Sequence, residues 1–295
     1  MVLPIVMAGG EGVRLRPLTV TRPKPMLPVV NRPILWHILS LLRRNGYKSA
    51  KVTLHYLAES IEEYFKYRSP GVELEYSVEE RALGTAGGIK LLEDSIGETF
   101  LVVSGDLITD YDLRGLVEFH RKSGALATMA LSRVKNPTEY GIVITDEDGR
   151  ITRFLEKPGW SEVFSDLVNA GIYVMEPEVL RYIPRGRQFD FSKDLFPLLL
   201  EKGEPIYGFP MSGFWRDVGL PHHYLNVQFE LLDGKAKLEI PGKFRDGIWF
   251  GEGVEVDPDA ELIPPCVIDD YVKIGSGSKI GPYAIIGRDT IIGSE

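Results

Sequence analysis

The sequence predicts an α/β fold: a mostly parallel mixed sheet with helices on both faces, followed by a short parallel β-helix. First, apolar runs typical of buried strands alternate with amphipathic helical patterns through the first half of the chain. Second, an apolar residue recurs at every sixth position from Phe250 onward, which is the mark of a parallel β-helix. We therefore expect two domains, residues 1–234 and residues 235–295.

The elements are expected in the following order. The first strand is Leu3 to Met7, an apolar run bounded by glycines. The first helix is 33–45, where apolar residues fall at helical spacing and Gly46 follows as a C-cap. Further strands are expected at 51–56, 72–78, 99–104, 126–132, 141–145, 150–156 and 168–174. Further helices are expected at 58–67, from the G-T-A-G-G run to about 93, and at 112–123, 177–182, 192–202 and 220–232.

Composition limits the classes of protein that the chain can belong to. The 295 residues carry a formal net charge of −8, which argues against a general nucleic-acid binder because phosphate-backbone binding rests on a basic surface. Cys266 is the one cysteine, so no internal disulfide can form. The N-terminal apolar run, residues 2–8, is too short for a signal peptide or a membrane span. We expect a cytoplasmic protein with no membrane or nucleic-acid partner.

Three glycines, Gly9, Gly10 and Gly12, directly follow the first strand. Glycine lets backbone N–H groups approach a ligand closely, and consecutive N–H groups in such a turn make a concave anion site. Arg14 and Lys24 add positive charge nearby, so the loop is interpreted as a cradle for a polyphosphate. It is not a Walker loop, which needs G-x-x-x-x-G-K-[ST], and the dinucleotide fingerprint fails because Leu15 stands where its third glycine should be.

The longer stretch G-G-x-G-x-R-L-x-P-L-T, followed by P-K-P-M-L-P-V, closely resembles the signature of sugar-1-phosphate nucleotidyltransferases. These enzymes join a sugar phosphate to a nucleotide and release pyrophosphate. The resemblance runs from residue 1 to about residue 232 and includes N-P-x-x-Y-G-I-V and D-F-S-K-D-L-F-P. It implies a Rossmann-like sheet. The chain most resembles mannose-1-phosphate guanylyltransferase-like members that carry a C-terminal hexapeptide-repeat β-helix.

The resemblance assigns roles to individual residues of this chain. The implied catalytic set is Arg14, Lys24, Asp106, Lys157 and Asp217, of which Asp106 and Asp217 would bind Mg²⁺. The implied nucleotide-binding set is Ala8, Gly9, Gly10, Gly12, Arg14, Lys24, Glu79, Glu80, Gly84 and Thr85. The implied sugar-phosphate-binding set is Gly141, Glu156, Lys157 and Asn169.

The acidic pair Glu79–Glu80 before L-G-T-A-G resembles guanylyltransferases that act on mannose 1-phosphate. A carboxylate can accept both N1–H and N2–H of guanine, whereas uracil and thymine present one N–H between two carbonyls. Arg81-Ala82 departs from the family pattern, in which an acid or a proline often stands. GTP and mannose 1-phosphate are the expected substrates. A glucose-1-phosphate uridylyl- or thymidylyltransferase is the alternative, and the sequence does not fix the sugar epimer.

Two other classes of protein fit the sequence less well. A hexapeptide-repeat acyltransferase usually needs a histidine in or beside the β-helix, and no histidine follows His223. A non-catalytic regulatory subunit that binds nucleotide sugar would typically lose the basic loop residues or the metal-binding acids, which this chain keeps. His222 and His223 are adjacent, so on a helix they are expected to diverge and to lie at the surface without sharing a metal.

The C-terminal repeat resembles hexapeptide-repeat proteins, which implies a left-handed β-helix with three hexads in each coil. Cys266 falls on a small-residue position of the repeat and is expected to be a core residue, not a nucleophile. The aliphatic residues of the last coil, Ile286 and Ile292, lack a covering layer, and repeat arrays need caps. Either the natural chain continues past Glu295 or another subunit covers this end, and a homo-oligomer, dimer or larger, is expected.

Overall fold

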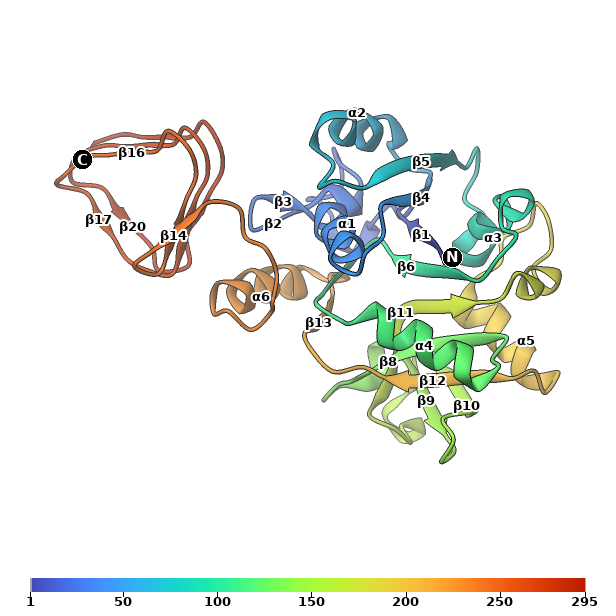
Figure 1. The fold of residues 1–295 in the computed structure, drawn as a ribbon. Coiled ribbons are helices and arrows are strands. Elements are labelled where there is room, and N and C mark those ends of the chain that lie inside the picture. The colour runs from blue at the N-terminus through green and yellow to red at the C-terminus, as the bar shows by residue number, and fades with distance from the viewer. Residues whose placement is uncertain (1, 295) are drawn as a thin grey trace.

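The computed structural model describes residues 2–294 and contains a mixed sheet of nine strands (Figure 1). The strand order is β10-β9-β11-β6-β1-β4-β5, with β8 beside β11 and β12 beside β8. The bounds are β1 Leu3–Met7, β4 Ser49–Leu54, β5 Glu73–Val78, β6 Phe100–Ser104, β8 Ala127–Arg133, β9 Gly141–Thr145, β10 Ile151–Glu156, β11 Leu167–Met175 and β12 Ile206–Pro210. All seven strands that the sequence predicts after β1 are present within a few residues of their predicted bounds.

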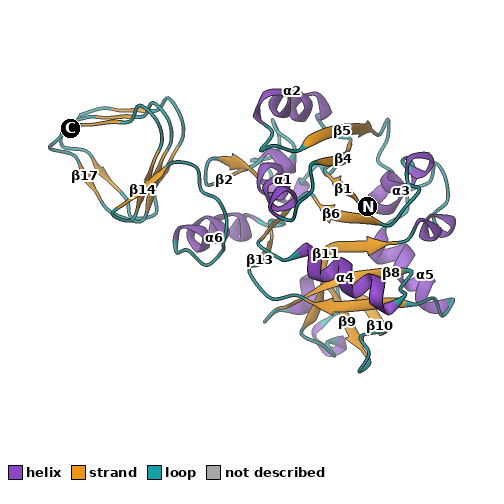
Figure 2. Cartoon of the chain, viewed as in Figure 1, coloured by secondary structure: helices purple, strands orange, loops and turns teal. Residues whose placement is uncertain are grey.

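Helices cover both faces of this sheet, as predicted (Figure 2). Their bounds are α1 Ile34–Arg44, α2 Ala58–Arg68, α3 Gly84–Lys90, α4 Leu113–Ser123, α5 Phe196–Glu201 and α6 Pro221–Leu232. Apolar residues of α1, α2, α4 and α6 belong to one core, and those of α3 and α5 belong to the other. Neighbouring residues of β1 alternate between the two cores, since Ile5 packs in one and Val6 in the other.

The strands of the first part of the chain pair in parallel, whereas most pairs made by the later strands are antiparallel, so the expectation of a mostly parallel sheet is wrong for the later strands. Strands β6, β1, β4 and β5 pair in parallel, and β12 pairs in parallel with β8. Strand β11 is antiparallel to β6, β8 and β9, and β9 is antiparallel to β10. For β9 and β10 the physical reason is the short connection at 146–150, because a parallel pair needs a long crossover.

A small antiparallel pair lies apart from the main sheet and was not predicted. Strand β13 (Trp215–Asp217) pairs with β7 (Leu107–Thr109), so that Asp217 stands opposite Leu107. Each strand has three residues, which is too short for periodicity to reveal. The pair brings the segment around residue 217 to the end of β6.

The C-terminal region consists of short strands in parallel stacks around three sides, with β14 added antiparallel to β15 (Figure 1). Their bounds are β14 Lys243–Arg245, β15 Ile248–Phe250, β16 Glu255–Val256, β17 Glu261–Leu262, β18 Cys266–Ile268, β19 Lys273–Ile274, β20 Lys279–Ile280, β21 Ile285–Ile286 and β22 Ile291–Ile292. Val256 pairs with Ile274, which pairs with Ile292, so partners are separated by three hexads. This register is compatible with the predicted β-helix, and Cys266 is buried in its core.

Several contacts join the C-terminal stacks to the preceding part of the chain, among them an ion pair between Arg32 and Asp269 and two hydrogen bonds. The Asn31 side chain, in the turn between β2 (Pro28–Val29) and β3 (Arg32–Pro33), donates to the backbone carbonyl of Ile286 at 2.8 Å. The Tyr283 hydroxyl donates to Asp233, just after α6, at 2.8 Å. Within residues 2–294, no helix is long and apolar enough to cross a membrane.

Candidate active site

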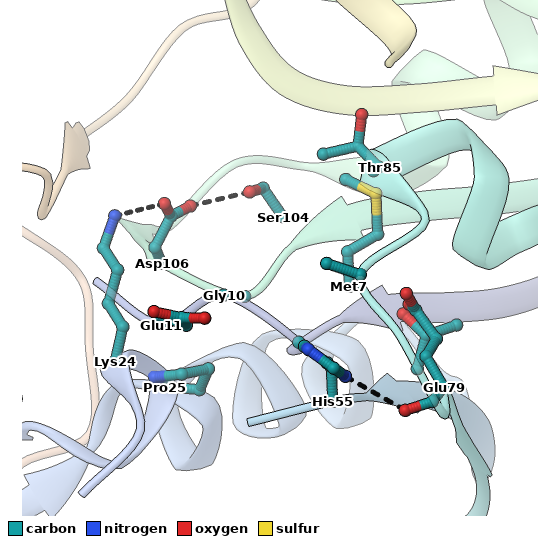
Figure 3. A pocket seen from close by; sticks show the side chains of 15 residues that line it. Met7, Gly10, Glu11, Lys24, Pro25, His55, Glu79, Thr85, Ser104 and Asp106 are labelled. Carbon is teal, nitrogen blue, oxygen red and sulfur yellow. Dashed lines mark hydrogen bonds and ion pairs between the residues drawn. The ribbon is translucent and has the colours of Figure 1, made fainter. Parts of the chain in front are cut away.

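The carboxyl ends of β1, β4 and β6 surround a cavity of about 270 Å³ (Figure 3). Ligands of such sheets bind at these strand ends. The lining residues are Met7, Gly9, Gly10, Glu11, Lys24, Pro25, Thr53, His55, Glu79, Ala82, Gly84, Thr85, Ser104, Gly105 and Asp106. The glycine loop and Asp106, which the sequence predicts at one edge of the sheet, are therefore brought together.

The glycine loop is shaped by the close approach of Lys24. Gly12 has a φ of +66°, and a Cβ atom there would lie 2.9 Å from Cβ of Lys24 and 2.9 Å from Thr19. Gly10 has open space at that position and lines the cavity. Ala8 and Gly12 are not among the lining residues. Only glycine fits the left-handed turn at position 12 without strain, and this turn leaves room for the Lys24 side chain.

Lys24, Asp106 and Asp217 form a partly buried charged cluster. The ammonium of Lys24 pairs with Oδ2 of Asp106 and lies 3.8 Å from Oδ1 of Asp217. Ser104 donates to Oδ1 of Asp106 at 2.6 Å (Figure 3). The Lys24 side chain is 9% exposed, against 27% and 22% for the two aspartates. Asp106 and Asp217, the metal ligands predicted from the sequence, therefore both lie beside the buried ammonium of Lys24.

The two carboxyl groups of this cluster differ in their pKa values. Burial is the largest influence at Asp106, but the charge and hydrogen bond of Lys24 and the hydrogen bond of Ser104 outweigh it and lower the pKa. At Asp217, burial and then the charge of Asp106 raise the pKa to about 6. Two carboxylates therefore face a single ammonium. This donor set fits Mg²⁺, which favours one or two carboxylates together with substrate phosphates.

A second cavity, of about 330 Å³, adjoins the first and shares Met7, Thr85, Ser104 and Asp106 with it. It is lined by every residue of the predicted sugar-phosphate set, namely Gly141, Glu156, Lys157 and Asn169, and also by Arg14 and Asp217. Lys157 is exposed and has a φ of +47°. A non-glycine residue in this conformation carries backbone strain, and the backbone N–H of Lys157 is held by the carbonyl of Tyr140 at 3.0 Å.

Glu156 lines the second cavity, and its side chain lies over the backbone of Gly141. These two residues pair across the β9–β10 hairpin. A Cβ atom on Gly141 would lie 2.7 Å from Oε2 of Glu156 and 2.6 Å from the ring of Phe154. Burial raises the pKa of Glu156. The position of this carboxyl therefore depends on the absence of a side chain at residue 141.

The two glutamates before α3, Glu79 and Glu80, lie in different environments. Glu79 is buried and lines the first cavity, whereas Glu80 is exposed and is not among the lining residues. Oε2 of Glu79 accepts a hydrogen bond from the backbone N–H of Leu83 at 3.0 Å. Burial raises the pKa of Glu79. Gly84, at a φ of +75°, and Thr85 both line the first cavity.

Several lining residues were missed by sequence reasoning. His55 directly follows β4, and its Nδ1 lies 3.0 Å from the backbone carbonyl of Glu79; its place at a strand end was a usable signal. Trp215 stacks edge-on against Tyr140, with ring centroids 5.4 Å apart. Ser192 lies 3.1 Å from the amide of Asn169. Tyr140 and Ser192 lie in the stretches N-P-x-x-Y-G-I-V and D-F-S-K-D-L-F-P, so the family resemblance was a usable signal for both, whereas Trp215 carried no such signal.

The expectation that His222 and His223 diverge is wrong. Their ring centroids lie 4.2 Å apart in an edge-on arrangement in the first turn of α6. His222 is exposed, as expected, whereas the His223 side chain is only 19% exposed. Nε2 of His223 lies 3.7 Å from Oε2 of Glu139. Backbone spacing separates adjacent helical side chains, but rotation of the two side chains brings the rings together here.

The chain matches the family model described as "Nucleotidyl transferase" over residues 3–234. It is 36% identical to a UTP–glucose-1-phosphate uridylyltransferase from Synechocystis sp., covering 98% of this chain and 80% of that protein. It is 37% identical to a mannose-1-phosphate guanylyltransferase from Mycobacterium tuberculosis, covering 94% of this chain and 77% of the relative. Its fold is similar to that of HddC from Yersinia pseudotuberculosis complexed with GMP-PN, at 23% identity and a TM-score of 0.68 over 78% of this chain and 100% of that chain.

Proposed function

Since this chain belongs to the nucleotidyl transferase family, we propose that it is a sugar-1-phosphate nucleotidyltransferase that makes GDP-mannose and pyrophosphate from GTP and mannose 1-phosphate. The observation that carries the proposal is the meeting of two cavities at Asp106, one beside the glycine loop and one beside Glu156 and Lys157. Relatives named mannose-1-phosphate guanylyltransferase, at 34–37% identity over most of this chain, support the choice of substrates.

The reaction joins two anions, so catalysis rests on positioning and charge neutralisation. The triphosphate occupies the first cavity, with the glycine loop on its oxygens and Lys24 beside it. The sugar phosphate occupies the second cavity, where Lys157 holds its phosphate and Glu156 accepts from sugar hydroxyls. Arg14, which was expected at the triphosphate, lines the second cavity and not the first, so it is assigned to the sugar phosphate as well. A phosphate oxygen of the sugar attacks the α-phosphorus, and the bond to the β-phosphate oxygen breaks to release pyrophosphate. Mg²⁺, when held by Asp106 and Asp217, supplies charge neutralisation at the phosphate oxygens.

Recognition of the base is assigned to Glu79, which alone of the acidic pair lines the first cavity. Because Leu83 already donates to Oε2 of Glu79, the other oxygen is the better acceptor for a guanine N–H. A charge-assisted hydrogen bond of this kind contributes about 1.5–3 kcal/mol. Uracil and thymine would place a carbonyl against the same oxygen, so the carboxylate selects for guanine.

Competition among GTP, UTP and dTTP tests this assignment. We expect the wild type to prefer GTP and Glu79→Gln to lose about 10- to 100-fold of that preference, the equivalent of one charge-assisted hydrogen bond. Glu80→Gln is the matched control and should keep the wild-type preference, since Glu80 is exposed outside the cavity lining. A wild type that prefers UTP or dTTP, or equal preferences in the two variants, contradicts the assignment.

The alternative substrates are UTP or dTTP with glucose 1-phosphate. One observation favours them: the relative from Synechocystis sp., a UTP–glucose-1-phosphate uridylyltransferase, covers 98% of this chain. The same competition distinguishes the two pairs of substrates when it is run in parallel with mannose 1-phosphate and with glucose 1-phosphate. Pyrophosphate release is the measured signal. No pyrophosphate release from any pair of substrates would instead favour a regulatory subunit without catalytic activity.

Gly141→Ala is expected to lower kcat/KM for the sugar phosphate by about 100-fold, because displacement of a positioning group by roughly 1 Å has an effect of this size. The new methyl group would lie 2.7 Å from Oε2 of Glu156 and force it out of the second cavity. Steady-state kinetics with varied sugar phosphate measures this.

The matched control is Gly115→Ala in α4, where a Cβ atom would meet only Asp112 Oδ2, at 3.8 Å. This variant should keep full activity and gain about 0.5–1 kcal/mol of stability, since alanine replaces glycine inside a helix. Equal activity in the two glycine variants would exclude the proposed role of residue 141.

We also propose that residues 1–234 form the catalytic domain and that residues 235–295 form a connector and a left-handed parallel β-helix. The 18-residue register of its strand pairs supports this proposal. Ile286 and Ile292, in the last strands of two stacks, are partly exposed, and we propose a homo-oligomer in which a second copy covers them. Light scattering should show a dimer or larger assembly, and a monomer at high protein concentration would count against it.

A further inference from the structure

Three metal-ligating side chains converge at the rim of the second cavity. Glu139 ends the 3-10 turn Pro137–Glu139, and His222 and His223 lie in the first turn of α6. One ligand atom of each lies within 4.8 Å of the other two. Glu139 also lines the second cavity, beside Tyr140 and Gly141. Segments more than 80 residues apart in the chain thus supply two imidazoles and one carboxylate to the same point.

The distances are close to those of a tetrahedral metal site. Metal bonds of 2.0–2.1 Å place ligand atoms roughly 3.4 Å apart in a tetrahedron. Oε2 of Glu139 and Nε2 of His223 are 3.7 Å apart, so small rotations of the three side chains would complete the geometry. A site with two histidines and one glutamate leaves a fourth position for water, as in many zinc sites.

Nε2 is the nitrogen of His223 that faces the cluster, since it lies 3.7 Å from Oε2 of Glu139. The other ring nitrogen, Nδ1, is buried and has no hydrogen-bond partner in the described part of the chain. No hydrogen bond from Nδ1 therefore fixes the ring in another orientation.

The nearby positive charges do not outweigh these features. Arg216 is held by both oxygens of Glu230, at 2.7 and 2.6 Å, so its charge is neutralised locally. Arg14 is exposed to solvent, where its charge is screened. The Glu139 carboxylate supplies the opposing negative charge within the cluster itself.

We propose that Glu139, His222 and His223 form a metal site for Zn²⁺ or another divalent ion that favours imidazole, separate from the Asp106–Asp217 pair. Imidazole nitrogen suits Zn²⁺, Ni²⁺ and Co²⁺, whereas Mg²⁺ favours oxygen ligands. A bound ion would link the turn before β9 to α6. Because Tyr140 and Gly141 follow Glu139 directly and line the second cavity, this link would hold one wall of that cavity in place. The proposal does not depend on the reaction that the enzyme catalyses.

Co²⁺ is the probe, because four-coordinate nitrogen-ligated Co²⁺ absorbs visible light much more strongly than six-coordinate Co²⁺ with oxygen ligands. The full chain without a polyhistidine tag is titrated with Co²⁺ in a buffer free of chelators. We expect one strongly absorbing Co²⁺ for each chain, displaced by Zn²⁺. The variants His222→Gln, His223→Gln and Glu139→Gln should each weaken Co²⁺ binding at least about tenfold. Even the loss of a group that only orients a metal ligand weakens metal sites 10- to 100-fold.

Two controls separate this site from others. His55→Gln removes a histidine from the first cavity, and the double variant Asp106→Asn/Asp217→Asn removes the proposed magnesium ligands; both should keep the strong Co²⁺ absorption. Glu139→Gln keeps the size of a side chain that is 34% exposed, so this variant should fold normally, and unchanged circular dichroism would verify this. The proposal is overturned if the absorption is missing in the wild type, or if it is lost in the double aspartate variant and kept in Glu139→Gln and His223→Gln.

Discussion

Asp217→Asn and Asp106→Asn should each lower turnover by about 10²- to 10³-fold, corresponding to roughly 3–4 kcal/mol of lost transition-state stabilisation. Asp106 lines both cavities, and Asp217 lines the second cavity and stands 3.8 Å from the Lys24 ammonium. Replacing either by a neutral amide removes a negative charge from the proposed magnesium site while keeping the shape of the side chain. Steady-state kinetics at saturating Mg²⁺ measures the loss.

Asp148→Asn is the matched control, because Asp148 is exposed in the turn between β9 and β10; its turnover should be that of the wild type. The pH dependence adds a second readout. The Asp217 carboxyl, with a pKa of about 6, is protonated below that pH, and the proton competes with the metal. The apparent affinity for Mg²⁺ should therefore fall as pH is lowered through about 6 in the wild type but not in Asp217→Asn. Near-normal turnover in both aspartate variants would refute the metal assignment.

Lys24→Met should cause a loss of similar size, about 10²- to 10³-fold in turnover. Lys24 is the buried cation that pairs with Asp106 and lines the first cavity. Without it, the negative charge that develops on the phosphates meets two carboxylates with no ammonium beside them. The variant should also depend more steeply on Mg²⁺, which would become the main source of positive charge.

Lys51→Met is the matched control for Lys24→Met. Lys51 is also buried and also ion-paired, with Glu75, but it lines neither cavity. This control should lose some stability and keep its turnover. If the two lysine variants lose turnover equally, the loss comes from the fold and not from the proposed chemistry of Lys24.

Much of the site was predictable because its residues follow strands. The apolar run Leu3–Met7 and the run that ends at Ser104 identify two buried strands, and parallel strands end at one edge. The glycine loop and Asp106 are therefore adjacent, as the structure has them. The place of Asp217 was assigned by family resemblance alone, because the three-residue strand that carries it is too short to have a detectable period.

The rest depends on contacts that only tertiary structure creates. The crossing of Glu156 over Gly141 follows from the register of the β9–β10 hairpin, and a shift of one residue would turn Glu156 to the other face. The division between Glu79 and Glu80 follows from the turn that leads into α3, where Leu83 donates to Glu79. The approach of His222 to His223 depends on side-chain rotation, which residue spacing does not specify.

The most direct test of the account is to follow the α-phosphate. The protein is incubated with Mg²⁺, mannose 1-phosphate and GTP labelled either at the α- or at the γ-phosphate. If the protein makes GDP-mannose, the α-label moves into GDP-mannose while the γ-label leaves in pyrophosphate. Asp217→Asn should slow both transfers to the same extent. Recovery of the α-label in GMP or GDP without a nucleotide sugar, or of the γ-label as free phosphate, would contradict the proposed reaction.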